Sequence, residues 1–191
     1  MLTTGIAGAP RLRASEINLT DNEGTLLALV ARAEPITAHQ IAKVYEESPV
    51  SNFSTSKGTI YPIVRRLRAA GLLKARKVSG DGRGTEQLET TRKGQKAIRK
   101  WVMEIRPAHL IPEDMLRTKV QSFDLLTRDE RIEWISEVKV RLLERLDELE
   151  EYGKEVTVPF KDFVHDNAVR SVRGRMDWLD KLLNHVVRDK Q

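Results

Sequence analysis

The residues best suited to a chemical role lie in one stretch, residues 56–71, which reads SKGTIYPIVRRLRAAG. Its apolar residues recur at the spacing of a helix, at Ile60, Ile63, Val64 and Leu67. Arg65 and Arg66 point away from that stripe, so one face would pack and the other would be basic. Small polar residues at the start of a helix and arginines on its exposed side suit it to bind the major groove of DNA. The stretch alone fits a basic surface helix equally well.

Both ends of this helix are predicted as well. Ser56 can act as the N-cap residue, and Gly71 follows the last apolar residue, where a left-handed C-cap is needed. Pro62 lacks a backbone N–H, but close to the start of a helix that N–H has no intrahelical acceptor to lose. We therefore expect a loose first turn and no break.

The positive charge of the chain is concentrated around this helix. The whole sequence has a net charge of +5, but residues 57–100 hold 13 Lys and Arg against 3 Asp and Glu, a net charge of +10. Residues 106–191 hold 16 basic and 18 acidic residues, a net charge of −2. This asymmetry is typical of a module that binds a polyanion, joined to a nearly neutral module through which copies of the chain associate.

Composition excludes several classes of protein. The 191 residues include no cysteine, so disulfides, cysteine metal sites and thiol nucleophiles are excluded. The four histidines are isolated and no serine has the surroundings of a catalytic nucleophile, so we expect no enzyme activity, no metal and no cofactor. No stretch is apolar enough to cross a membrane and none resembles a leader, which predicts a soluble cytoplasmic protein without membrane contacts.

The sequence predicts two parts before residue 106: a flexible arm over residues 1–19 and a winged helix-turn-helix domain over residues 20–105. Only 5% of the residues are aromatic and 32% are charged, which favours a mainly α fold whose helices have charged outer faces. Thr20 and Glu23 form a capping box that starts a first helix, and Thr37 repeats the pattern for a short second one. The basic helix of residues 56–71 is then the third.

After Gly71 the pattern changes from helical to extended. Residues 72–78 and 85–90 read as two strands joined by a glycine-rich loop, and Thr91 caps a further helix. The hairpin is basic, so its tip would lie well against a phosphate backbone. Three helices followed by such a hairpin make a winged helix-turn-helix.

Residues 106–191 are predicted to form a long-helix antiparallel dimerisation domain. A short helix opens at Pro112 and reaches Leu126. Thr127 then begins a second capping-box helix that is expected to end at Gly153.

The last helix carries an apolar stripe that begins at Phe160. A run of about 30 residues at 1.5 Å per residue would reach about 45 Å, too far for a small domain of the same chain to cover. An antiparallel helix pair packed on a second copy would bury the stripe and set the two recognition helices about 34 Å apart, one turn of DNA. A helix that folds back over its own winged domain in a monomer is the alternative. The predicted dimer contacts are Val164, Val172, Trp178, Leu179, Leu183 and Val186.

Several of these segments together resemble a known family. Residues 58–62 (GTIYP), Leu67, residues 71–73 (GLL) and residues 91–94 (TRKG) are similar to the DNA-binding domain of PadR-type transcriptional regulators. The Tyr–Pro pair inside the recognition helix is fairly specific, since a generic winged helix lacks it. Residues 175–179 (RMDWL) resemble the helical half of the larger members.

This resemblance implies a homodimeric, repressor-like protein with one recognition helix per subunit in successive major grooves of a palindromic operator. It implies DNA contacts from the start and exposed side of that helix and from the wing: Ser56, Lys57, Thr59, Tyr61, Arg65, Arg66, Lys77 and Arg83. The alternative for each arginine is a solvated surface charge, and most contacts in a complex would go to phosphate. The second wing strand departs from the family pattern, because Glu86 and Glu89 add two acids where aromatic residues are often found.

The resemblance also implies a small-molecule effector. Relatives often release DNA on binding a small, commonly aromatic molecule near the junction of the winged domain and the dimer helices. Trp101 and Trp178 are the candidates for lining such a pocket, with Trp134 as a weaker one. Tryptophan at helical spacing is also common in a dimer core, and that alternative stays open.

Two further functions stay open beside an operator-binding repressor. A winged domain can serve for protein contacts alone, with the basic helix against an acidic partner. It can also bind DNA as an architectural protein without an operator, with high affinity that is indifferent to sequence.

Overall fold

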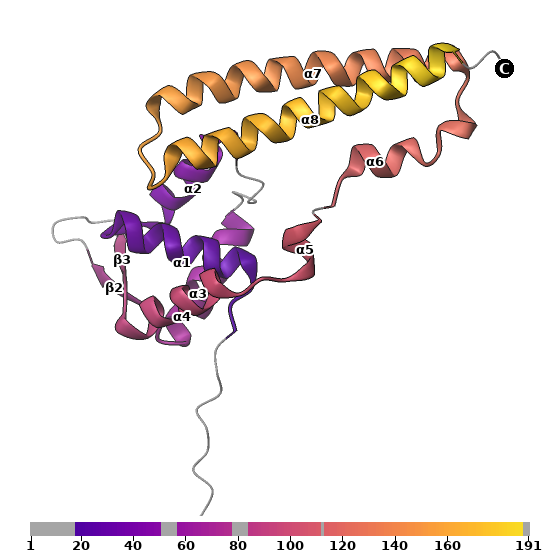
Figure 1. The fold of residues 1–191 in the computed structure, drawn as a ribbon. Helices are drawn as coiled ribbons and strands as arrows, with labels where there is room; N and C mark the ends of the chain where they lie inside the picture. Colours follow the sequence, from indigo (N-terminus) through magenta and orange to yellow (C-terminus); the bar gives the residue numbers. More distant parts are fainter. Residues whose placement is uncertain (1–17, 51–56, 78–83, 112, 189–191) are drawn as a thin grey trace, which may run out of the picture. The chain divides into compact units, whose positions relative to one another are not determined.

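A computed structural model describes residues 18–50, 57–77, 84–111 and 113–188 of the chain (Figure 1). The predictions for most of the N-terminal arm, for Ser56, for Arg83 and for the side chain of Lys57 lie outside the described residues. Two compact units form: the first holds residues 18–41 and 57–105, and the second holds residues 42–50 and 106–188. In the described ranges, no helix is both long and apolar enough to cross a membrane. We call the first unit the winged-helix domain.

Threonine residues start three of the helices, as the sequence predicts. Thr20 accepts a hydrogen bond from the backbone N–H of Glu23 at 3.2 Å, and the Glu23 carboxylate accepts one from the N–H of Thr20 at 2.9 Å. Thr37 makes the same reciprocal pair with Gln40, at 3.2 and 2.9 Å, and Thr91 accepts from Gly94. These caps satisfy amide groups that the first turn of a helix leaves without an acceptor. The helices are α1 (Asp21–Ala33), α2 (Ala38–Glu46) and α4 (Arg92–Met103).

The basic stretch forms α3 (Lys57–Ala69), which runs through Pro62 without a break. Gly71 has a φ of +70°, and the N–H of Leu72 donates to the Leu67 carbonyl at 2.9 Å. This left-handed C-cap confirms the predicted end of the helix, because a side chain at that φ would be strained.

A three-stranded antiparallel sheet completes the winged-helix domain, with the order β1-β3-β2. The wing strands β2 (Leu73–Lys77) and β3 (Glu86–Thr90) confirm the predicted hairpin. The sequence does not indicate β1 (Ile36–Thr37), because two residues are too few to show an alternating pattern. Leu88 pairs with Ile36 of β1 on one side and with Ala75 of β2 on the other. The strand β3 is therefore the central strand, and β1 ties the wing to the rest of the domain.

The core of the winged-helix domain is made by the inner faces of its helices and sheet. Its fully buried side chains are Leu26, Leu27, Val30, Ile41, Ile60, Leu67, Leu72 and Leu88. Because α3 contributes to this core along one stripe, its opposite side is held at the surface in a fixed orientation.

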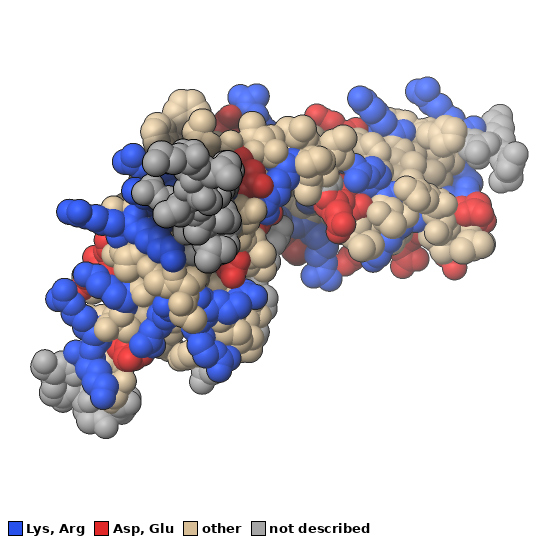
Figure 2. Space-filling model, turned by 90° about the horizontal axis from the view of Figure 1, so that it is seen from below, with Lys and Arg blue, Asp and Glu red and all other residues tan. Residues whose placement is uncertain are grey.

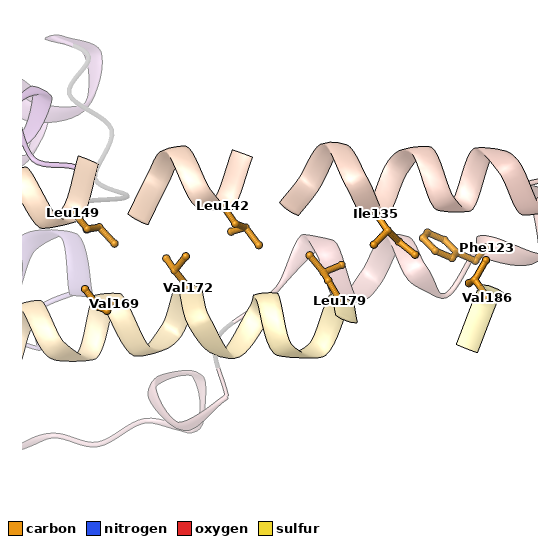
Figure 3. Close-up of a cluster of buried hydrophobic side chains, with 8 residues drawn as sticks. All are labelled: Phe123, Ile135, Leu142, Leu149, Val169, Val172, Leu179 and Val186. Carbon is orange, nitrogen blue, oxygen red and sulfur yellow. The ribbon is translucent and has the colours of Figure 1, made fainter. Parts of the chain in front are cut away.

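The second unit is built on two 28-residue helices, α7 (Arg128–Glu155) and α8 (Lys161–Arg188), which lie side by side (Figure 1). Short elements precede them: α5 (Pro107–Leu110), α6 (Met115–Val120) and a 3-10 helix at Phe123–Leu125. Figure 3 shows the apolar side chains of α7 and α8 directed toward one another along the whole pair. The buried cluster is Phe123, Ile135, Leu142, Leu149, Val169, Val172, Leu179 and Val186. The mainly α fold with a pair of long antiparallel helices is thereby confirmed.

Three details of the second half differ from the predictions. The helix expected up to Leu126 already ends at Val120, because the chain turns before Phe123 enters the core. Gly153 lies inside α7 and does not end it. A Cβ there would lie 2.5 Å from the His165 ring, so this glycine permits close helix packing. Phe160 precedes α8 with a φ of +57° and is 79% exposed, so it is not part of the buried stripe.

The start of α7 gives a prediction for pH dependence. The backbone N–H and the hydroxyl of Thr127 donate to the Glu130 carboxylate at 2.7 and 2.8 Å, which lowers the pKa of Glu130 below its ordinary value of 4.5. A lowered pKa in the folded state means that this stabilisation is present above about pH 4.5 and is lost as the pH falls through the folded value. The variant Glu130→Gln is therefore expected to show a smaller loss of Tm below about pH 4.5 than the wild type, measured by circular dichroism. Parallel pH profiles would contradict this account.

Candidate nucleic-acid interface

The outer side of α3 carries the residues that the sequence singles out. Ile60, Ile63, Val64 and Leu67 are buried, while Tyr61 is 49% exposed and Arg65 is exposed. Thr59 is half-buried. The structure therefore brings Tyr61 and Arg65 to one accessible surface, one turn apart on the same helix.

The three arginines of α3 have different surroundings. The Arg66 Nε lies 3.3 Å from a carboxylate oxygen of Glu23 in α1, so this side chain links two helices. Arg68 reaches the Glu86 carboxylate of β3 with two N–H groups, at 2.6 and 3.4 Å, and links α3 to the wing. Within the described residues, Arg65 has no ion-pair partner, so its charge remains available for a ligand.

The wing is basic and internally paired. Lys74 lies 2.6 Å from the Glu89 carboxylate and Arg76 lies 3.8 Å from it. The hydrogen bond from Lys74 holds the pKa of Glu89 below its ordinary value; desolvation opposes this shift, and the charges of Arg76 and Lys74 add to it. Lys77 at the end of β2 is exposed. The two acids that depart from the family pattern thus each contact basic residues of the same domain.

A groove of about 540 Å³ lies within the winged-helix domain, between the start of α2, the outer side of α3 and the start of β3. Its polar lining comes from all three elements: His39, Tyr61, Arg65, Arg68, Thr85 and Glu86. His39 was not among the predicted site residues, since in the sequence it is an isolated histidine. Its proximity to α3 depends on how α2 packs, which no local pattern records.

The surface charge of the domain matches this arrangement. Figure 2 shows Lys and Arg side chains gathered over the winged-helix domain, at the left of the view. A surface of this sign attracts the phosphate backbone of nucleic acids. Among the described residues, no group of three His, Asp or Glu side chains is placed to hold a metal ion.

The tryptophans proposed for an effector site belong to different units. Trp101 donates from Nε1 to the Asp21 carboxylate at 3.1 Å, and its ring packs on Gly24, where a Cβ would lie 2.3 Å away. Trp178 is half-buried against the core of α7 and α8. Trp134 meets Phe123 edge to face, with ring centroids 5.1 Å apart. Each ring therefore contributes to packing inside its own unit.

The residues predicted for dimerisation divide into two sets. Val172, Leu179 and Val186 are already covered within the single chain, because α7 packs over them. These three residues of the apolar stripe thus need no second copy to bury them. This corrects the argument from the sequence that only a second copy of the chain could cover the stripe. Val164 is 47% exposed, and Trp178 and Leu183 are half-buried, so these three retain surface that a second copy could cover.

Comparisons with known proteins agree with this architecture. No curated protein sequence matches the chain. The crystal structure of *Bacillus subtilis* PadR in complex with operator DNA has a TM-score of 0.72 at 18% identity, covering 86% of this chain and 98% of that one. The same protein in complex with p-coumaric acid has a TM-score of 0.67 at 19% identity, covering 87% and 96%. The PadR-like regulator BC1756 from *Bacillus cereus* has a TM-score of 0.67 at 18% identity, covering 89% and 100%.

At these identities the likeness shows the fold, and the family follows from the sequence. Residues 26–100 match the model of the transcriptional regulator PadR-like family. That range contains α3, the wing and most of α1 and α4, the elements on which the site is built. Over residues 26–100 of its winged-helix domain, this chain therefore matches the PadR-like family of transcriptional regulators.

Proposed function

We propose that the protein is a repressor that binds a palindromic operator as a homodimer, with α3 in the major groove and the wing against the backbone. The observation that carries this proposal is Arg65, an exposed arginine without an ion-pair partner in the described chain, beside Tyr61 on the outer side of α3. A family match over this same helix and wing supports the proposal. *B. subtilis* PadR, which shares the fold, has been crystallised with operator DNA.

A homodimer would set the distance between the two recognition helices of the repressor. Two copies of α3 about 34 Å apart would meet successive major grooves on one side of the duplex. Val164, Trp178 and Leu183 of α8 are the proposed contacts, because they are the predicted ones that retain exposed surface.

A small aromatic effector is the second part of the proposal. *B. subtilis* PadR has been crystallised with p-coumaric acid, which supports a similar class of ligand for this protein. Trp101 and Trp178 stay the proposed effector residues. Quenching of tryptophan fluorescence by p-coumaric acid, reduced in Trp101→Phe and in Trp178→Phe but not in Trp134→Phe, would test the assignment.

The decisive experiment selects bound sequences from a pool of random duplexes at the highest salt that retains complex. Enrichment of a palindrome with half-sites one turn apart is the expected result. Salt-sensitive binding without enrichment would replace the repressor by an architectural DNA binder. No binding at low salt would assign the basic helix to a protein partner.

Removal of the unpaired arginine should weaken DNA binding. We expect Arg65→Ala to reduce the salt dependence of binding by about one unit of slope if the contact is to phosphate, or to cost about 1–3 kcal/mol at one base pair if it is to a base. Fluorescence anisotropy at several salt concentrations measures both. Arg145→Ala on α7, an exposed arginine paired with Glu148, is the matched control and should leave the slope unchanged. An unchanged slope and affinity for Arg65→Ala would contradict the proposed interface.

A further inference from the structure

The groove of the winged-helix domain is lined by one arginine that is paired with an acid and one that, among the described residues, is not. Arg68 is held by Glu86, whereas Arg65 has no ion-pair partner within the described chain. The formal charge of the lining is therefore positive. His39 is exposed and, among the described residues, has no hydrogen-bond partner, so its ring can donate to a ligand.

The start of α2 adds to the same anion preference. Thr37 accepts from the N–H of Gln40, but the earlier amide groups of the helix, at Ala38 and His39, have no intrahelical acceptor. No acidic residue lies in this first turn to neutralise the helix dipole. Two elements, α2 and α3, thus direct positive charge or N–H donors at one groove.

We propose that this groove seats one phosphate of the DNA backbone, beside the major groove that α3 enters, with His39 and Arg65 as its side-chain contacts. The inference rests on the proposed function. An imidazole N–H and a guanidinium both donate to phosphate oxygens. Glu86 is a positioning residue here: it holds Arg68 toward the wing and leaves Arg65 to meet the phosphate.

The groove favours the DNA backbone over a small molecule on chemical grounds. Its volume of about 540 Å³ would suit a small ligand, but such sites are mostly apolar and enclosed. This groove instead lies on the outer side of α3 and is lined largely by charged and polar side chains. A small anionic ligand remains an outcome that the experiment separates.

The test combines a variant of the protein with operator duplexes in which one phosphate of the DNA backbone is replaced by an uncharged group. The operator obtained by selection is prepared with a single methylphosphonate at each backbone position in turn, and the affinity of the full chain is measured for each duplex. His39→Ala is expected to bind the unmodified operator about tenfold more weakly. At one backbone position the methylphosphonate should weaken binding by the wild type more than binding by the variant, because the variant has already lost the His39 contact and keeps only that of Arg65.

Matched variants keep the result interpretable. His185→Ala, at an exposed histidine of α8, should behave as the wild type at every position. His39→Lys should restore both the affinity and the sensitivity to that one phosphate. If His39→Ala binds as tightly as the wild type, or loses the same factor at every backbone position, the groove does not seat a phosphate. If neither protein binds any duplex, the proposed function itself fails.

Discussion

Replacement of Gly94 by alanine is expected to destabilise the winged-helix domain by about 3 kcal/mol. Gly94 is buried near the start of α4, and a Cβ built on it would lie 2.3 Å from the Leu72 carbonyl oxygen. The Leu72 carbonyl belongs to the backbone, so it cannot rotate away from the added Cβ as the end of a flexible side chain could. The same carbonyl accepts a hydrogen bond from the N–H of Thr91 at 3.0 Å, so any shift also disturbs the cap of α4.

Urea unfolding, monitored by hydrogen exchange of the core amides of α1 and α3, measures this loss. DNA affinity should fall in parallel once the domain begins to unfold under the assay conditions, because α3 is oriented by the same core. Gly174→Ala in α8 is the matched control, since nothing lies within 4 Å of its added Cβ. In a helix interior that change should stabilise the protein by about 0.5–1 kcal/mol. Equal tolerance of both substitutions would contradict the close contact at Leu72.

The parts of the fold that the sequence predicts are those determined locally. Capping boxes need only residues three positions apart, and the starts of α1, α2 and α7 are where Thr20, Thr37 and Thr127 indicate. Gly71 likewise marks a backbone conformation that few other residues adopt. Gly153 shows the limit of such signals, because a glycine that permits packing and one that ends a helix look alike in sequence.

The candidate site is only partly predictable for the same reason. The amphipathic pattern of α3 places Tyr61 and Arg65 at the surface, as expected. It cannot show that Arg66 and Arg68 are paired, because their partners, Glu23 and Glu86, lie on other elements. Which arginine stays available depends on the register between α3, α1 and β3, and that register exists only in the folded domain.

Truncation of Leu179 to alanine is expected to have the second large effect, on the pair of α7 and α8. Leu179 is fully buried between these helices, so the variant would leave a cavity and lose about 3 kcal/mol of unfolding free energy. If the homodimer forms through this unit, affinity for the palindromic operator should fall much more than affinity for a single half-site. Urea unfolding and anisotropy on the two duplexes measure the two effects separately.

Val164→Ala is the contrasting change on the same helix. Val164 is 47% exposed in the single chain, so its truncation should alter the free energy of unfolding by less than about 0.5 kcal/mol. A loss of palindrome affinity in this variant would then report a contact with a second copy, because the fold of the single chain is intact. An equal loss on palindrome and half-site for Leu179→Ala would contradict dimerisation through this unit. The pair of variants thus separates residues that hold α7 and α8 together from residues left free to meet a partner.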